Sequence, residues 1–200
     1  MVSVALVLAG CTTLKRCAYE GIDRDDWQKP DKVIGELAIQ PGDRVADIGS
    51  GSGYFTFRLA RAVGPTGKVY AVDIDEELND YVALRARQEG YANIEIILAT
   101  PDHASLPSPG VNLIFTSNTY HHIADRPTYF ARLKNSLGPN GRIAIIEFSD
   151  KGWFAGLAGH ATSGSVIKHE MQAAGYVLES EYDFLPKQSF LVFSKSHRPG

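Results

Sequence analysis

The most informative stretch of this chain is Val45-Ala46-Asp47-Ile48-Gly49-Ser50-Gly51-Ser52-Gly53-Tyr54. It indicates a buried strand that ends in an acidic residue and then a glycine-rich turn. The residues that follow have the spacing of a helix, with one apolar face formed by Phe55, Leu59, Ala62 and Val63. Because the three alternate glycines carry no Cβ, the backbone can adopt conformations closed to other residues, and a ligand can lie directly against it.

A second acidic residue ends the next apolar strand, which we expect at 68–73 with Asp73 as its last residue. Asp75 then has the position of a helix N-cap, and Gly90 that of the residue that ends the helix. Two strands, a glycine turn and a carboxylate after the second strand predict the nucleoside-binding half of a doubly wound sheet.

The spacing of the glycines indicates which nucleoside cofactor is bound. Dinucleotide-binding turns follow the pattern G-x-G-x-x-G, but here the second gap is one residue long and Tyr54 stands in place of the third glycine. Asp47 would repel a pyrophosphate group, whereas it would attract a cationic cofactor. S-adenosylmethionine is such a cofactor, since it carries a sulfonium and an ammonium group. An NAD-dependent dehydrogenase is the less favoured alternative.

The run Asp47–Gly53 resembles motif I of the class I S-adenosylmethionine-dependent methyltransferases, and Asp73 is similar to the acid that binds the ribose in that family. Tyr120-His121-His122-Ile123 resembles the sequence that follows the fourth strand in small-molecule and quinone-type methyltransferases. Phe190–Phe193 resembles the antiparallel last strand of the family's fold. The resemblance covers about 27–195, which is most of the chain.

This resemblance implies an α/β fold with a doubly wound, Rossmann-like sheet of seven strands, mainly parallel, with an antiparallel last strand in a single domain. The alternation of predicted strands and helices agrees with it. Two hundred residues suffice for one domain with a full core. We expect the methyltransferase domain at 27–196, preceded at 1–26 by an apolar N-terminal segment and a linker. The fifth strand is expected at 142–148, after a helix at 127–137.

The resemblance also implies where S-adenosylmethionine is held. The turn would approach the methionine part, Asp47 its ammonium, Asp73 both ribose hydroxyls and Ile74 the adenine ring. In the family an acid directly after the third strand contacts the adenine amino group, but here Thr100 has about that position and Asp102 follows later. The full set of expected cofactor-binding residues is Asp47, Gly49, Ser50, Gly51, Gly53, Tyr54, Asp73, Ile74, Asp102 and Asn118.

Candidate catalytic residues follow the fourth strand. Methyl transfer is an in-line displacement that mainly requires alignment, and a general base is needed only if the acceptor must lose a proton. His121 and His122 are the favoured candidates, since histidine titrates near neutral pH; Tyr120 and Glu147 are also available. The alternative is that the histidine pair only caps and packs a helix.

Several classes of partner and chemistry are not expected. The net charge of −3 gives no field to hold a polyanion, so nucleic acid is a weak candidate. Cys11 and Cys17 are the only cysteines and precede the fold, which excludes a cysteine nucleophile within it. We expect no metal, because Asn118 and Glu147 supply too few carboxylates for a hard cation and the other histidines are scattered.

The N-terminus leaves the localisation open. Leu8-Ala9-Gly10-Cys11 looks like a bacterial lipobox, in which Cys11 would be lipidated and anchor the protein to a membrane. The apolar stretch before it is far too short to span a bilayer and lacks the basic region of a signal peptide. The two alternatives are a membrane-anchored lipoprotein and a cytoplasmic enzyme with an apolar terminus.

These features favour methyl transfer from S-adenosylmethionine to a small-molecule acceptor. The alternative of a different class is a non-catalytic module that binds S-adenosylmethionine but has lost its acceptor site. The segment 149–164 contains four glycines together with Trp153 and Phe154, which predicts either a lid over the acceptor or a plain surface loop.

Overall fold

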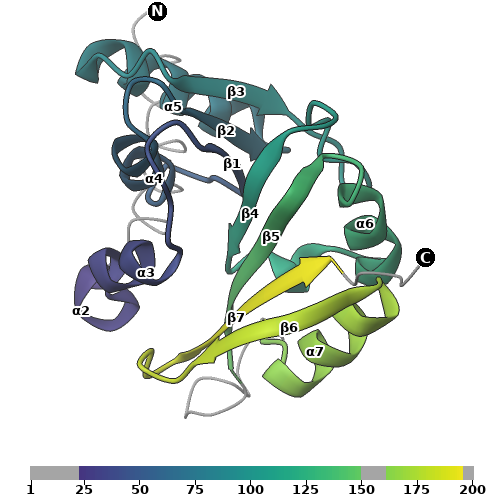
Figure 1. Cartoon of the computed structure of the whole chain (residues 1–200). Helices are drawn as coiled ribbons and strands as arrows, with labels where there is room; N and C mark the ends of the chain where they lie inside the picture. The colour runs from purple at the N-terminus through teal and green to yellow at the C-terminus, as the bar shows by residue number, and fades with distance from the viewer. Residues whose placement is uncertain (1–22, 150–160, 196–200) are drawn as a thin grey trace, which may run out of the picture.

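The computed structural model describes residues 23–149 and 161–195, which form an α/β fold around one sheet (Figure 1). The sheet has seven strands in the order β3-β2-β1-β4-β5-β7-β6. Their bounds are Arg44–Ile48 (β1), Lys68–Asp73 (β2), Ile94–Leu98 (β3), Val111–Ser117 (β4), Leu137–Phe148 (β5), Tyr176–Tyr182 (β6) and Gln188–Lys195 (β7). Neighbouring strands in the series β3-β2-β1-β4-β5 are parallel, and β7 is antiparallel to both of its neighbours, β5 and β6. The predicted fold class is confirmed.

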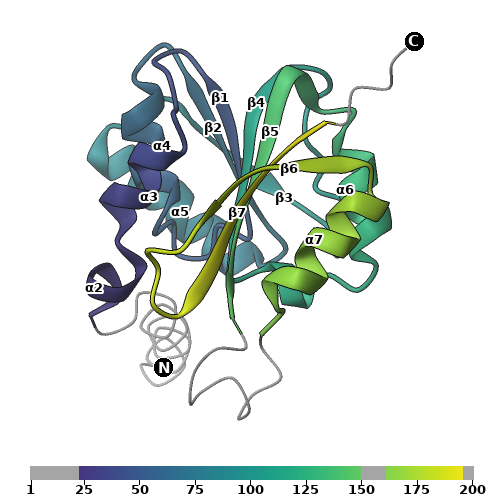
Figure 2. The ribbon, with the colours of Figure 1, turned by 60° about the horizontal axis from the view of Figure 1, so that its bottom comes forward.

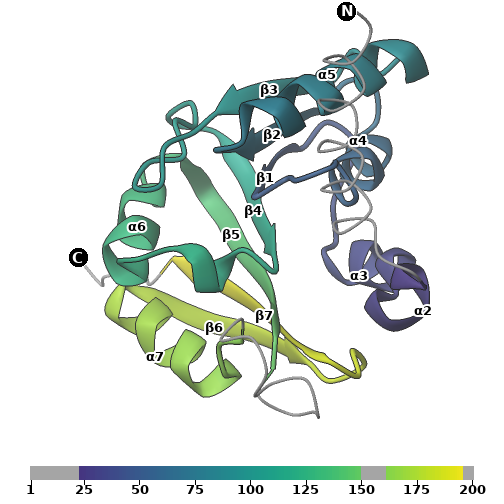
Figure 3. The same cartoon turned by 180° about the vertical axis from the view of Figure 1, so that it is seen from behind.

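Helices cover both faces of this sheet (Figure 2). Their bounds are Arg24–Gln28 (α2), Pro30–Glu36 (α3), Thr56–Val63 (α4), Glu76–Glu89 (α5), Tyr120–His122 (η1, a 3₁₀ helix), Arg126–Leu133 (α6) and Gly164–Ala173 (α7). On one face, Val33 of α3 and Leu59 of α4 belong to one apolar core, and Val82 of α5 to a smaller one. On the other face, Phe130 of α6 and Met171 of α7 share a core. Figure 3 shows the two groups of helices on opposite sides of the sheet.

Strand β5 begins earlier than the sequence predicts. We expected a helix through 137 and a strand from 142, but α6 ends at Leu133 and β5 starts at Leu137. Leu137 is buried and pairs with Val111, after which the register shifts before Leu113 pairs with Arg142. The predicted end of the helix was wrong because pairing with β4 draws Leu137 into the sheet.

The structure also forms a helix inside the stretch that the sequence assigns to the linker. Helix α2 ends at Gln28 and is capped by Lys29, whose backbone is left-handed; Pro30 then opens α3, where a proline is favoured. Cys11, with its predicted lipid anchor, and most of the predicted lid at 149–164 lie outside the described residues. Within the part of the chain that the structure describes, no helix is long and apolar enough to cross a bilayer.

Candidate functional site

A cavity of about 530 Å³ opens at the carboxyl ends of β1, β4 and β5. It lies where the strand order reverses between β1 and β4, which is the usual ligand position in an open α/β sheet. The predicted site residues that line it are Asp47, Gly49, Ser50, Gly51, Tyr54, Asn118, His121 and His122. One part of the lining, the glycine-turn wall, consists of Asp47, residues 49–52 and Tyr54. A second part, here called the aromatic wall, consists of Trp27, His121, His122 and Phe148.

The glycine turn has a backbone that other residues rarely adopt. The φ angles of Gly49, Gly51 and Gly53 are all positive, at 74°, 54° and 85°. A Cβ added at Gly49 would lie 2.0 Å from Oγ1 of Thr119, which follows β4. A glycine at position 49 is therefore required by packing between the turn and the segment after β4, as well as by any ligand.

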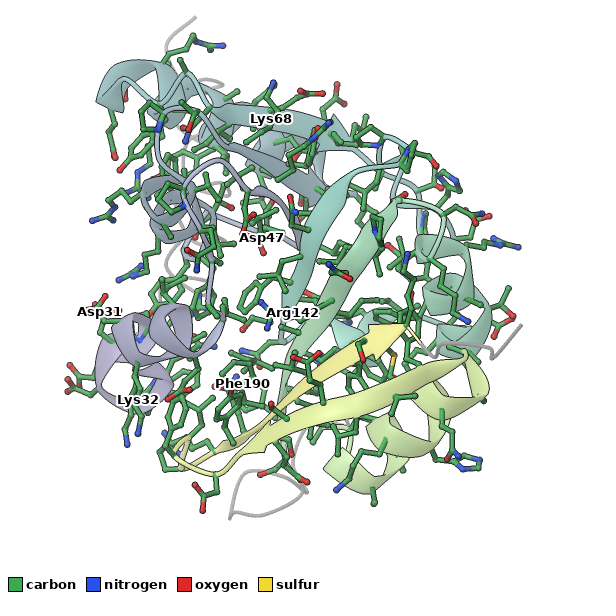
Figure 4. The ribbon with its side chains drawn as sticks, in the orientation of Figure 1. Asp31, Lys32, Asp47, Lys68, Arg142 and Phe190 are labelled. Atoms are coloured by element: carbon green, nitrogen blue, oxygen red, sulfur yellow. The ribbon has the colours of Figure 1, made fainter. Side chains whose placement is uncertain are left out.

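Asp47 lies inside the molecule, between helix α4 and strand β4 (Figure 4), and is 2% exposed. The hydroxyl of Thr56 donates a hydrogen bond of 2.6 Å to its Oδ2 atom. Burial raises the pKa of the Asp47 carboxyl to about 7; Asp73 adds to the rise, while the bond from Thr56 and the charge of Arg24 oppose it. A positively charged ligand in the cavity would favour the ionised form of Asp47.

Asp73, the last residue of β2, stabilises the glycine turn through hydrogen bonds. Its Oδ2 atom accepts a hydrogen bond of 2.8 Å from the backbone N–H of Gly51, and its Oδ1 atom accepts one of 3.0 Å from Asp75. Each carboxylate oxygen can accept a further hydrogen bond, so a ligand hydroxyl can still bind here. The next residue, Ile74, is 59% exposed and presents an apolar surface beside this carboxylate.

The aromatic wall contains a histidine held by a buried carboxylate. His121 Nδ1 lies 2.9 Å from Glu147 Oε1, and the backbone N–H of His121 donates to Oε2 of the same glutamate at 3.2 Å. Glu147 is at the end of β5 and is fully buried. The ring of His122 lies next to that of His121, with a centroid distance of 4.0 Å. The sequence named both histidines and the glutamate, and the structure brings them together.

Helix α2 completes the cavity with two residues that sequence reasoning missed. Trp27 stacks on Phe148 with a centroid distance of 5.7 Å, and both line the cavity. Arg24 also lines it, with its guanidinium 3.7 Å above the ring of Tyr54; burial lowers the pKa of Arg24 to about 10. Gln28, fully buried, attaches α2 to the sheet by donating 2.8 Å to Ser117 Oγ. A five-residue helix gives no periodic signal by which the sequence could have revealed these contacts.

The comparisons with known proteins identify the family. A family model described as a methyltransferase domain matches residues 39–182. The chain belongs to the class I S-adenosylmethionine-dependent methyltransferases. The structure of an S-adenosylmethionine-dependent methyltransferase from Aquifex aeolicus superimposes with a TM-score of 0.85 at 23% identity, covering 92% of this chain and 98% of the other.

Curated relatives of this methyltransferase match at similar identity. The ubiquinone/menaquinone biosynthesis C-methyltransferase UbiE of Hahella chejuensis is 27% identical over 118 residues, which is 58% of this chain and 47% of that protein. The arsenite methyltransferase of Halobacterium salinarum is 30% identical over 110 residues, covering 55% of this chain and 28% of that protein. The aligned part thus spans about half the length of the UbiE relatives and less than a third of the length of the arsenite methyltransferase.

The glycine-turn wall of the methyltransferase fits its cofactor. The hydroxyls of Ser50 and Ser52 are buried and line the cavity, and neither has a hydrogen-bond partner among the described residues. Buried polar atoms of this kind are usually satisfied by a ligand or water. Together with the carboxylate of Asp47, they suit a polar, positively charged methionine moiety.

Of the predicted cofactor contacts, Asn118 lines the cavity, whereas Asp102 lies outside it. Asn118 lines the cavity in a left-handed conformation, with φ 56°, and accepts 2.6 Å from Gln188. Asp102 is exposed and lines a separate pocket of about 340 Å³ that also includes Arg132. A hydrogen bond from Thr100 lowers the pKa of Asp102. The structure therefore does not bring Asp102 to the glycine-turn cavity.

Tyr120 lies beside the histidines in sequence but has a different environment. It is fully buried, and its hydroxyl donates 2.7 Å to Glu170 Oε2, which also binds Arg126. Burial raises the pKa of Tyr120 well above its usual value, and Tyr120 does not line the cavity. Its contacts fix η1 to α6 and α7. Among residues 23–149 and 161–195, no group of three or more metal-binding side chains occurs.

Proposed function

We propose that this methyltransferase transfers the methyl group of S-adenosylmethionine to a small-molecule acceptor bound in the 530 Å³ cavity. One observation carries the proposal: the glycine-turn wall and the aromatic wall face the same cavity. A cofactor held on the first wall would have an acceptor on the second wall as its immediate neighbour, as in-line displacement requires. The volume is in the range of pockets for small ligands.

The cofactor would be held by groups of complementary charge. Asp47 would bind the ammonium of the methionine moiety, and Arg24 its carboxylate, because the two side chains line the same cavity with opposite charges. Asp73 would accept hydrogen bonds from the ribose hydroxyls, and the exposed side chain of Ile74 would cover the adenine. The backbone and hydroxyls of residues 49–54, with Asn118, would complete the site. When bound, the cofactor supplies a methyl group on sulfonium sulfur, which is a good leaving group.

The acceptor would lie against Trp27 and Phe148. Their stacked rings form an apolar surface at the cavity, and apolar walls with a few polar groups are typical of small-molecule sites. The UbiE relatives are named for quinone biosynthesis, which supports an acceptor with a flat ring. His121 or His122 would take up the proton of an acceptor that must lose one. Asp102 stays a candidate adenine contact outside this cavity.

The proposal is tested by incubating the purified protein with S-adenosylmethionine labelled in its methyl group and a small-molecule extract. The expected result is S-adenosylhomocysteine together with a labelled small molecule. Cofactor binding without either product would support the non-catalytic binding module instead. Binding of a nicotinamide nucleotide in place of S-adenosylmethionine would support the dehydrogenase.

A double variant tests whether the two histidines contribute to methyl transfer without contributing to cofactor binding. His121→Ala combined with His122→Ala should bind the cofactor as the wild type does but transfer the methyl group at least 100-fold more slowly, the usual range for loss of a general base. Full turnover in the double variant would contradict a catalytic role for either histidine.

A further inference from the structure

The carboxylate of Glu147 contacts His121 twice, once at the backbone N–H and once at the imidazole ring. This carboxylate is fully buried, and three nitrogen atoms, two of them backbone N–H donors, lie within hydrogen-bond distance of it. Oε1 lies 2.9 Å from His121 Nδ1 and accepts 2.8 Å from the backbone N–H of Phe148, while Oε2 accepts 3.2 Å from the backbone N–H of His121. The glutamate therefore holds His121 at two points, the main chain and the ring.

We infer that Glu147 is a positioning residue that fixes the orientation and tautomer of His121 for removal of a proton from the acceptor. This inference rests on the proposed function. Two backbone donors already point at the carboxylate, so the group that they surround is an acceptor of hydrogen bonds. The Nδ1 atom must then carry a hydrogen and donate it to Oε1. In the neutral ring, Nε2 is consequently the nitrogen that accepts a proton.

The arrangement assigns different roles to the two adjacent histidines. The side chain of His121 is 8% exposed, lines the cavity and is held by a buried carboxylate. His122 is exposed at the rim of the same cavity, with its ring against that of His121. A buried anion beside Nδ1 stabilises the imidazolium that forms when Nε2 takes up a proton. His121 receives this support from Glu147.

The proton balance of the transfer defines the class of acceptor. The acceptor's X–H bond breaks, its electron pair forms the new bond to the methyl carbon, and the proton goes to Nε2 of His121. The bond between sulfur and methyl breaks with its electrons left on sulfur, so that the sulfonium becomes a neutral thioether. Acceptors that need this assistance are weak acids, such as a phenol or an enol. An acceptor that is already ionised would not need it.

The direct test is the tautomer of His121 in the purified full chain. Long-range ¹H–¹⁵N correlation spectra are expected to show His121 protonated at Nδ1 in the wild type and a mixture of tautomers in Glu147→Gln. The matched control is Glu170→Gln, which removes the carboxylate that holds the adjacent Tyr120 but does not touch the ring of His121. The control should keep the wild-type tautomer. The same tautomer in all three proteins, or His121 protonated at Nε2 in the wild type, would overturn the inference.

The kinetic test uses two phenols of different acidity, 4-methoxyphenol and 4-nitrophenol, as probe acceptors. Glu147→Gln should lower kcat about 100-fold for 4-methoxyphenol, the range expected of general-base catalysis, and much less for 4-nitrophenol, which is largely ionised at pH 8. Calorimetric affinity for S-adenosylhomocysteine should stay within twofold of the wild type. An equal loss with both phenols would indicate a merely structural role and contradict the inference.

A second variant keeps the test decisive if Glu147→Gln does not fold. In His121→Asn the amide nitrogen takes about the position of Nδ1 and can still donate to Glu147, but no atom replaces Nε2. We expect it to bind S-adenosylhomocysteine normally and to lose transfer to 4-methoxyphenol at least 100-fold. Retained transfer would overturn the inference. A wild-type protein that binds no S-adenosylmethionine would contradict the proposed function, and this result does not depend on the tautomer of His121.

Discussion

The two walls of the cavity differ in how far apart in sequence their contacting residues lie. In the glycine-turn wall, Thr56 binds Asp47 from nine residues away, and Gly51 binds Asp73 from 22 residues away. In the aromatic wall, Trp27 of α2 stacks on Phe148 of β5, and Gln28, which attaches α2 to the sheet, is 89 residues from its partner Ser117. The first wall is built mainly from one strand-turn-helix unit and the next strand, whereas the second requires the start of the domain to meet β4 and β5.

This difference implies that the two walls respond separately to mutation. Changes in the glycine-turn wall should alter cofactor affinity, and changes in the aromatic wall should alter acceptor binding or turnover. Gly49 lies against Thr119, which directly precedes η1 and its two histidines, so this contact connects the glycine turn to the segment that carries part of the aromatic wall.

Gly49→Ala should damage both walls at once. The new Cβ would clash with Thr119 Oγ1, 2.0 Å away, at a residue whose φ is +74°. We expect a loss of about 3–5 kcal/mol in the free energy of unfolding from overpacking and backbone strain, measured by urea titration. Gly35→Ala is the control, because α3 leaves open space there at an ordinary φ, and it should be neutral or slightly stabilising.

The cause of the Gly49 effect can be checked by a second substitution. Adding Thr119→Gly to Gly49→Ala removes the clashing side chain and should restore part of the lost stability. The strain from the positive φ would remain. No recovery at all would mean that the walls do not interact at this contact.

Asp73→Ala should weaken binding of S-adenosylhomocysteine by about 2 kcal/mol, or roughly 30-fold. The substitution removes the carboxylate that accepts from Gly51 and that would bind the ribose. Isothermal calorimetry measures the change. Glu95→Ala is the control: its exposed carboxylate on β3 pairs with Lys68 and has no place in the proposed site, so we expect less than a twofold change. A large loss in Asp102→Ala would support the predicted adenine contact.

The pH dependence of cofactor binding should report on Asp47. With its pKa raised to about 7 by burial, Asp47 is mostly protonated and neutral at pH 5.5 and half ionised at pH 7. Because the ionised form attracts a cationic ligand, affinity for S-adenosylmethionine should rise about tenfold or more between these pH values. Asp47→Asn should bind more weakly than the wild type at pH 7 and lack this dependence. A rise of the same size in Asp47→Asn would assign the effect to another group.

Trp27→Ala should affect the aromatic wall alone. Loss of the ring against which the acceptor would lie should raise the KM for the acceptor about fivefold, as expected if an aromatic contact with the acceptor is worth about 1 kcal/mol. The calorimetric affinity for S-adenosylhomocysteine should stay within twofold. Phe184→Ala is the control, since this half-buried ring lies outside the cavity lining. A large fall in cofactor affinity in Trp27→Ala would show that the walls are not separable.

How much the sequence predicts follows the same division between the walls. The strand pattern, the glycine turn and the acids at the ends of β1 and β2 predicted the fold and the residues of the glycine-turn wall, although Asp102 lies apart from it. The start of β5 was missed because Leu137 enters the sheet through a partner, Val111, that local pattern does not reveal. The histidines were named, but not the bond from His121 to Glu147.

Strand periodicity and turn chemistry are properties of neighbouring residues, so they were enough to predict a mainly parallel sheet with a glycine turn between two acids. In contrast, the approach of Arg24 and Trp27 of helix α2 to the cavity and the contact between Glu147 and His121 became visible in the folded chain. Those contacts depend on strand order and on side-chain packing between distant segments. A buried carboxylate acquires its partners only when the strands of the sheet are aligned side by side.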